Sequence, residues 1–428
     1  MFKNHPKGMV VLFFTEMWER FGFYIMMAIF VLYMDREFGW SDSKKGDFYG
    51  TFLLGVYFLP VLGGWLGDKF LGQINTIRFG SISMIFGYIA LALSASNRLV
   101  LFYLGLILVA FGTGIFKVNM AVLVGNLYRK KVHLKDAGFN IYYMGVNVGA
   151  ALAPLTATFI GIVYDSYHIS FWAAAVGMSL SLIIMQVGKS HLFEADTRIS
   201  PITNQSRDSN SKVIEISREE GIQRVITLVI LFFIVIFFWI AFYQNGFALT
   251  LFAKRSTLES PILRPETYQF FNPLFILMLT PFLLSIFSSL NKKGKEPSTP
   301  LKIFYGLMIM GFSMLVMVLG SWMGGNADMN IMSPAWLIST YLVMTLAEIL
   351  ISPMGQSFVS KVSPPKIQGL MMGFWFGATA VGSFSSGIFG KLYSSLPHHY
   401  FYLILAGLLF FSAILILLAF KKLKRFAD

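Results

Sequence analysis

The chain has 428 residues, of which 56% are hydrophobic and only 13% charged, and its formal net charge is +13. With a mean hydropathy of +0.67, this composition excludes an ordinary soluble domain and indicates a polytopic membrane protein. Because the chain contains no cysteine, disulfides, a thiol nucleophile and Cys-ligated metal sites are also excluded.

Apolar runs long enough to cross a bilayer follow one another along the whole chain. Twelve such runs lie near residues 9–33, 46–67, 74–96, 99–127, 137–164, 169–188, 224–252, 268–290, 301–322, 333–360, 367–391 and 399–420. A polar stretch rich in Ser, Asn and charge separates the sixth run from the seventh. We therefore predict twelve transmembrane helices in two sets of six, residues 1–188 and 224–428, joined by a cytoplasmic linker at residues 189–223.

The positive charges predict the orientation of the spans. Of the 34 Lys and Arg residues, 24 fall in the two termini and alternate loops or at the span ends beside them, eight fall in or beside the other loops, and only Arg20 and Lys117 lie deep inside spans. Since Lys and Arg concentrate on the cytoplasmic side, we expect both termini in the cytoplasm and a multi-pass protein of the plasma (inner) membrane. This topology accounts for the positive charge, so no nucleic-acid partner is expected.

The first apolar run carries three ionisable residues, Glu16, Glu19 and Arg20. On a helix these three fall on one face, and the same stripe continues through Phe23, Tyr24 and Met27. A charge in mid-membrane costs about 2.5–3.5 kcal/mol, so such residues usually face a bundle interior or a watery cavity. The alternative is a structural ion pair, but a simple pair needs one carboxylate and this run has two.

Two further charges are expected inside spans. Lys117 precedes the cytoplasmic Arg129 cluster by about ten residues, or roughly 15 Å of helix, which is too far for the side chain to reach water. Glu348 lies in the tenth run, with Ser352 one turn later on the same face. If these groups share one cavity, three carboxylates and two cations leave one negative charge, and one carboxyl should hold a proton. A zwitterionic guest adds no net charge, so substrate movement and proton movement would be linked.

Other residues in the spans are candidates for lining the cavity or bending the helices. The polar or aromatic residues that could line a site are Tyr24, Tyr57, Asn147, Gln244, Asn272 and Trp375. Taken singly, such a residue more often forms a helix–helix hydrogen bond or lies at the membrane interface than binds a ligand. Gly145, Gly149 and Pro353 allow bends and close helix contacts, and both packing and gating remain open for them. Asp68 follows the second run and is expected to form a helix-end or gate contact.

The sequence gives little support to an enzyme. All six histidines lie in or beside predicted loops, and neither an HExxH nor a Gly-x-Ser-x-Gly element is present. No catalytic residue, metal site or cofactor is therefore expected, apart from protons as the coupling ion.

Several motifs occur in a recognisable order. In the first half these are the helix 1 segment 16–24 (EMWERFGFY), Tyr57 with the loop GGWLGDKFLG, the Lys117 segment GTGIFKVN and the helix 5 segment FNIYYMGVNVG. In the second half, Gln244 follows a Phe-Trp pair, Asn272 opens NPLF, Glu348 opens EILISP and Trp375 lies in MMGFWF. In this order they resemble the proton-dependent oligopeptide transporter family of the major facilitator superfamily.

The resemblance implies an all-α membrane protein with the major facilitator fold, in which two six-helix bundles rock in the lipid bilayer around a central site. It implies a functional monomer that imports di- and tripeptides with protons. By analogy, Arg20 and Lys117 would attract the peptide carboxylate, and Glu348 would hold the amino terminus with Asn147 and Asn272. Glu16 and Glu19 would exchange protons and pair with Lys117 and Arg20. The residues left to shape the site are Tyr24, Tyr57, Gln244, Ser352 and Trp375.

The chain departs from the family pattern at several positions. Tyr243 occupies a helix 7 position that is acidic in many members, and Phe23, Met27 and Gly50 replace other typical residues. Because residues 189–223 contain no apolar run, we expect no extra helix pair between the halves. Two other functions remain open: a transporter of nitrate or another small anion on the same fold, as in plant relatives, and a non-transporting membrane receptor.

Overall fold

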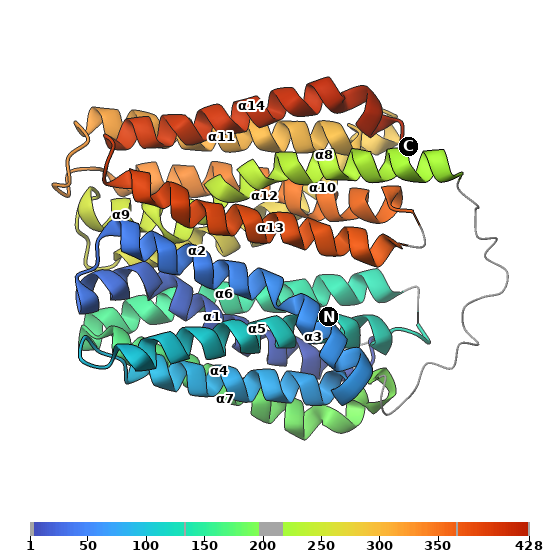
Figure 1. The fold of residues 1–428 in the computed structure, drawn as a ribbon, viewed down its shortest axis with the longest axis horizontal. Coiled ribbons are helices and arrows are strands. Elements are labelled where there is room, and N and C mark those ends of the chain that lie inside the picture. The colour runs from blue at the N-terminus through green and yellow to red at the C-terminus, as the bar shows by residue number, and fades with distance from the viewer. Residues whose placement is uncertain (1–3, 132–133, 197–216, 365–366, 427–428) are drawn as a thin grey trace. The chain divides into compact units, whose positions relative to one another are not determined.

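The computed structural model describes residues 4–131, 134–196, 217–364 and 367–426, which form helices and contain no β-strand (Figure 1). Within these residues, eleven helical segments are long and apolar enough to cross a membrane. The 23-residue helix α13, Gln368–Gly390, coincides with the eleventh predicted run. The predicted all-helical membrane fold is thereby confirmed.

The chain divides into two compact units. Unit 1 comprises Met1–Trp40 and Phe52–Ser211, and unit 2 comprises Ser41–Thr51 and Lys212–Asp428. Of the predicted linker, Lys189–Ala195 forms a 3-10 helix, whereas residues 197–216 lie outside the described residues. The division at residues 189–223 therefore stays a prediction.

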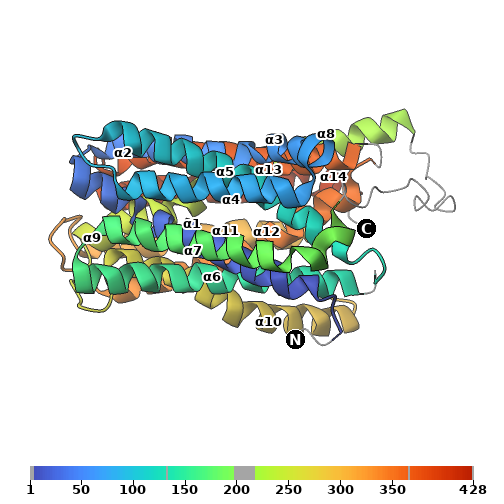
Figure 2. The ribbon, with the colours of Figure 1, turned by 90° about the horizontal axis from the view of Figure 1, so that it is seen from below.

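Unit 1 is built around its first helix. Its helices are α1 (Gly8–Phe38), the second part of α2 (Asp42–Phe58), α3 (Pro60–Leu66), α4 (Gln73–Ala92), α5 (Leu99–Leu127), α6 (Lys135–Tyr164) and α7 (Tyr167–Gly188). Helix α1 packs against both α6 and α7, which explains why almost its whole surface is buried. Helices α4 and α5 run side by side (Figure 2).

The described residues of unit 2 form seven complete α-helices. They are α8 (Arg218–Phe242), α9 (Ala248–Arg255), α10 (Phe271–Lys292), α11 (Thr299–Met323), α12 (Pro334–Val362), α13 and α14 (His398–Lys424). Helix α11 packs against α12 and α14, α8 packs against α13, and α10 lies along α12. The α10–α12 contact brings together two of the predicted site residues, as described below.

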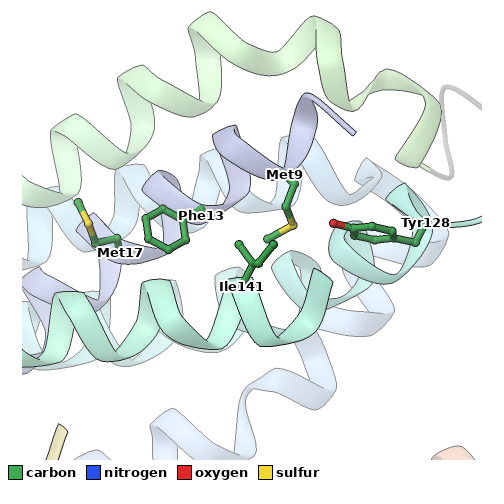
Figure 3. Close-up of a cluster of buried hydrophobic side chains, with 5 residues drawn as sticks. All are labelled: Met9, Phe13, Met17, Tyr128 and Ile141. Carbon is green, nitrogen blue, oxygen red and sulfur yellow. The ribbon is translucent and has the colours of Figure 1, made fainter. Parts of the chain in front are cut away.

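A cluster of apolar side chains joins the start of α1 to α6 in unit 1 (Figure 3). Its buried members are Met9, Phe13, Met17, Tyr128 and Ile141. Burial raises the pKa of Tyr128 to about 12, so its hydroxyl stays protonated and can donate to His5 Nδ1, 2.6 Å away. The cluster therefore anchors the chain just before the charged turn of α1.

The second predicted span is not one continuous helix. Pro60 begins α3 because its ring removes the backbone N–H that α2 would need in order to continue. Helix α3 passes into a π-helical turn, Gly67–Leu71, which contains Asp68. The exposed Asp68 carboxylate accepts a hydrogen bond of 3.1 Å from Gln73 Nε2, at the start of α4. Asp68 is thus a helix-end contact, and its gating role stays a prediction.

The seventh predicted span is interrupted, although its sequence reads as one apolar run. Helix α8 gives way to a 3-10 turn at Tyr243–Gly246 before α9 begins. The Tyr49 hydroxyl, from the part of α2 that belongs to unit 2, donates to the Tyr243 carbonyl at 2.8 Å. A Cβ on Gly246 would lie 2.5 Å from that hydroxyl oxygen, so glycine makes room for the tyrosine. Tyr49 therefore satisfies a carbonyl at the interruption.

At Gly145 and Gly149, α6 lies close against the backbone of α1. A Cβ at Gly145 would lie 2.9 Å from the Phe13 carbonyl oxygen, and one at Gly149 would lie 2.2 Å from that of Met17. The obstacles are backbone atoms, which no side-chain rotation can move. This geometry gives both glycines a packing role and holds α6 against the charged turn of α1.

We expect Gly149→Ala to lower the thermal unfolding temperature, because an added methyl group must push α6 away from the α1 backbone. Overpacking of this kind typically costs about 1–3 kcal/mol. The matched control is Gly407→Ala on α14, where a new Cβ meets nothing within 4 Å. Intrinsic fluorescence of the detergent-solubilised variants during heating would measure both; equal unfolding temperatures would contradict the packing role.

Candidate functional site

The charged turn of α1 is buried in unit 1. Glu16, Glu19 and Arg20 are 1%, 0% and 3% exposed. The Arg20 guanidinium donates from Nε and Nη2 to the two carboxylate oxygens of Glu19, and its Nε also lies 3.3 Å from Glu16 Oε1. One guanidinium thus lies within ion-pair distance of two carboxylates. Because buried charges need compensation, this turn calls for a second cation or a proton.

Lys117 on α5 supplies the second cation. Its Nζ lies 5.2 Å from the centre of the Tyr57 ring and interacts electrostatically with Glu16, Glu19 and Arg20. No carboxylate of the described residues lies within ion-pair distance of Lys117, so the predicted pair between a glutamate and this lysine is not formed here. The ammonium group rests instead on an aromatic face, which attracts a cation electrostatically, and its role in binding a peptide stays a prediction.

The remaining predicted residues of unit 1 have local contacts. Tyr24 is half-buried, and its ring lies edge-to-face with that of Phe23 at 5.5 Å. Asn147 is 4% exposed and donates to the Tyr143 carbonyl on its own helix at 2.8 Å. Their contacts with a peptide stay predictions.

Unit 2 brings Glu348 and Asn272 together, as the family resemblance implied. Asn272 Nδ2, at the start of α10, donates to Glu348 Oε2 on α12 at 2.8 Å and to Thr345 Oγ1 at 3.0 Å. Glu348 and Ser352 are both half-buried on α12. The prediction that Glu348 shares a chamber with the charges of unit 1 stays a prediction.

Gln244 and Trp375 occupy structural positions in unit 2. Gln244 is fully buried, and its Nε2 donates to the Ser386 carbonyl and hydroxyl at 2.9 and 3.1 Å, which ties the interrupted helix to α13. Trp375 is 1% exposed and fills space left by Gly355, where a Cβ would lie 2.0 Å from the indole. In these positions both side chains hold helices together, and their roles in binding a peptide stay predictions. Pro353 lies exposed within α12, and its gating role stays a prediction.

The structure also contains a charged network that the sequence analysis missed. Arg255, at the end of α9, donates to both carboxylate oxygens of Asp42 at 2.7 and 2.8 Å, and Lys45 Nζ lies 2.7 Å from Asp42 Oδ1. Lys45 is 0% exposed, although its place near a predicted helix end suggested a solvated charge. The only sequence signal was the i, i+3 spacing of Asp42 and Lys45.

Comparison with known proteins places this fold and these motifs in one family. The model of the POT family matches residues 74–217 and 202–403. The uncharacterized transporter YclF of Bacillus subtilis is 33% identical over 91% of this chain and 89% of its own length. Dipeptide and tripeptide permease A of Escherichia coli is 27% identical over 90% of this chain and 85% of its own.

A solved structure of the peptide transporter POT in complex with sulfate is 28% identical, covers 100% of this chain and 97% of its own, and has a TM-score of 0.89. The family match spans well over half of the chain. This protein therefore belongs to the POT family, whose members are multi-pass membrane transporters rather than enzymes.

Proposed function

We propose that this protein is a proton-coupled symporter that imports di- and tripeptides by alternating access. It spans the plasma membrane in this proposal, with both termini in the cytoplasm. Relatives named as peptide transporters support the substrate class. The distribution of Lys and Arg supports the orientation.

The observation that carries the proposal is the separation of charge between the units. Arg20 and Lys117 belong to unit 1, and Glu348 with Asn272 belongs to unit 2. A peptide with free ends is a zwitterion, so its carboxylate suits the two cations of unit 1 and its ammonium group suits the carboxylate of unit 2. In the proposed complex, Arg20 and Lys117 hold the carboxylate of the peptide, and Glu348 holds its ammonium group.

Proton coupling follows from the charge balance of these five residues. Three carboxylates and two cations leave one negative charge, which a zwitterionic peptide does not change. One bound proton makes the loaded site neutral. This lowers the free-energy cost of enclosing the site in a low-dielectric environment during transport. Glu19, which shares a guanidinium with Glu16, is the proposed carrier of that proton.

Uptake into proteoliposomes tests the function directly. Labelled dialanine is expected to accumulate under an inward proton gradient, and the accumulation should collapse when an uncoupler is added. Protein-free liposomes are the control. Nitrate uptake without dialanine uptake would instead indicate a small-anion transporter, and binding without accumulation would indicate a receptor; either result would overturn the proposal.

A further inference from the structure

A chain of hydrogen bonds on α12 ends at Glu348. The Thr345 hydroxyl donates to the Tyr341 carbonyl at 2.7 Å. Asn272 Nδ2 then contacts both Thr345 Oγ1, at 3.0 Å, and Glu348 Oε2, at 2.8 Å. All four residues belong to unit 2, and Thr345 is 0% exposed.

The chemistry of these groups determines which way the Asn272 amide faces. A carbonyl oxygen can only accept, so the single hydroxyl proton of Thr345 is committed to Tyr341. Thr345 Oγ1 can then only accept from Asn272, which requires the amide nitrogen to be the atom that faces it. The second N–H of the same nitrogen points to Glu348.

This orientation matters for the charge of Glu348. A donor facing the carboxylate stabilises its ionised form, whereas the amide oxygen could bond only to its protonated form. Without the acceptor at Thr345, the Asn272 amide could turn over and present that oxygen. No Lys, Arg or His of the described part of unit 2 forms an ion pair with Glu348, so Asn272 is its principal polar contact there.

We propose that Thr345 is a positioning residue that sets the selectivity for ligands with a free amino group. It acts through Asn272, whose amide it holds with the donor toward Glu348, and so keeps this carboxylate ready to accept from an ammonium group. The inference rests on the proposed function, because it specifies how the amino-terminal part of that site is maintained.

The test compares four variants of α12. Thr345→Val keeps the volume and removes the acceptor, and Thr345→Ser restores it. Thr340→Val is the matched control, because Thr340 is also 0% exposed and donates to the carbonyl of Trp336, four residues earlier, at 2.8 Å. No asparagine among the described residues bonds to the Thr340 hydroxyl. Thr345→Ala removes the same oxygen without adding a group, and gives the same readout if Thr345→Val folds poorly.

The readout is binding of labelled dialanine in competition with dialanine and with amino-acetylated dialanine, measured over a range of pH. Because the hydrogen bond between the Glu348 carboxylate and the ammonium group of the ligand joins charged groups, we expect Thr345→Val to reduce the preference for the free amine about tenfold. The pH below which the free-amine ligand is lost should move upward, since the turned amide favours protonated Glu348. Thr345→Ser and Thr340→Val should keep the wild-type preference and pH profile.

Two results would overturn the inference. One is a preference and pH profile of Thr345→Val that match those of Thr340→Val, and the other is an equal loss for both ligands, which indicates a purely structural role. Glu348→Gln in the same assay separates this failure from that of the proposed function. If Glu348→Gln also leaves the preference intact, the amino-terminal site itself is misassigned; if only Thr345→Val does, the positioning role alone fails.

Discussion

The Glu19→Gln variant is expected to exchange labelled dialanine in counterflow and to lose accumulation driven by a proton gradient. Glutamine can still accept a hydrogen bond from Arg20, so the buried turn of α1 remains intact, but it cannot take up a proton. One proton moving down a gradient of about one pH unit releases about 1.4 kcal/mol, enough for about tenfold accumulation. Without coupling, this accumulation should disappear while exchange continues.

Counterflow and gradient-driven uptake should be measured on the same batches of proteoliposomes. A suitable control is Glu194→Gln, because this carboxylate of unit 1 is exposed and pairs with Lys130 at the surface. Accumulation by Glu19→Gln at the wild-type level would show that another group carries the proton. Glu16→Gln would then be the next variant to examine, since Glu16 is the other carboxylate beside Arg20.

The Glu348→Gln variant should weaken the binding of peptides with a free amino group and leave the binding of amino-acetylated peptides nearly unchanged. The glutamine amide oxygen can still accept the bond from Asn272, so the α10–α12 contact survives while the charge is lost. A charge-assisted hydrogen bond contributes about 1.5–3 kcal/mol, which corresponds to roughly a tenfold to hundredfold increase in Kd.

Competition binding with the two ligands measures this effect without depending on the proton gradient. Thr340→Val provides a control about two turns earlier on α12, where a buried hydroxyl is removed and no charge changes. An equal loss of affinity for both ligands would refute the assignment of Glu348 to the amino terminus, because the defect would then be one of packing.

The positions of the membrane helices could be predicted from the sequence because each span must supply its own apolar length. The runs near residues 99–127 and 169–188 agree with α5 and α7 within two residues at each end. The functional importance of the charged turn of α1 could also be predicted, because an ionised group in an apolar run has few explanations other than function. The family motifs predicted that Asn272 and Glu348 lie in one site, and in the structure Asn272 Nδ2 lies 2.8 Å from Glu348 Oε2.

The interruption of the seventh span was not predicted, because residues 224–252 read as one apolar run, although Asn245-Gly246 is a dipeptide typical of turns. It depends on Tyr49, almost 200 residues earlier, whose hydroxyl satisfies the Tyr243 carbonyl. The same distance in sequence hid the pairing of Asp42 with Arg255, which makes a charge near a helix end part of a buried network. Gln244 and Trp375 matched family motifs, yet their packing against Ser386 and Gly355 is visible only in three dimensions.

The sequence by itself determined the membrane class, the number and length of the spans and the presence of ionisable residues within them. These properties follow from the cost of placing each residue in lipid, which is a sum over neighbours in the chain. Only the tertiary structure decided that Lys117 rests on Tyr57, that Arg255 pairs with Asp42, and that the Asn272 amide turns its donor toward Glu348. Hydrogen bonds and ion pairs depend on distances of a few ångströms between atoms from different helices, and the packing of those helices sets these distances.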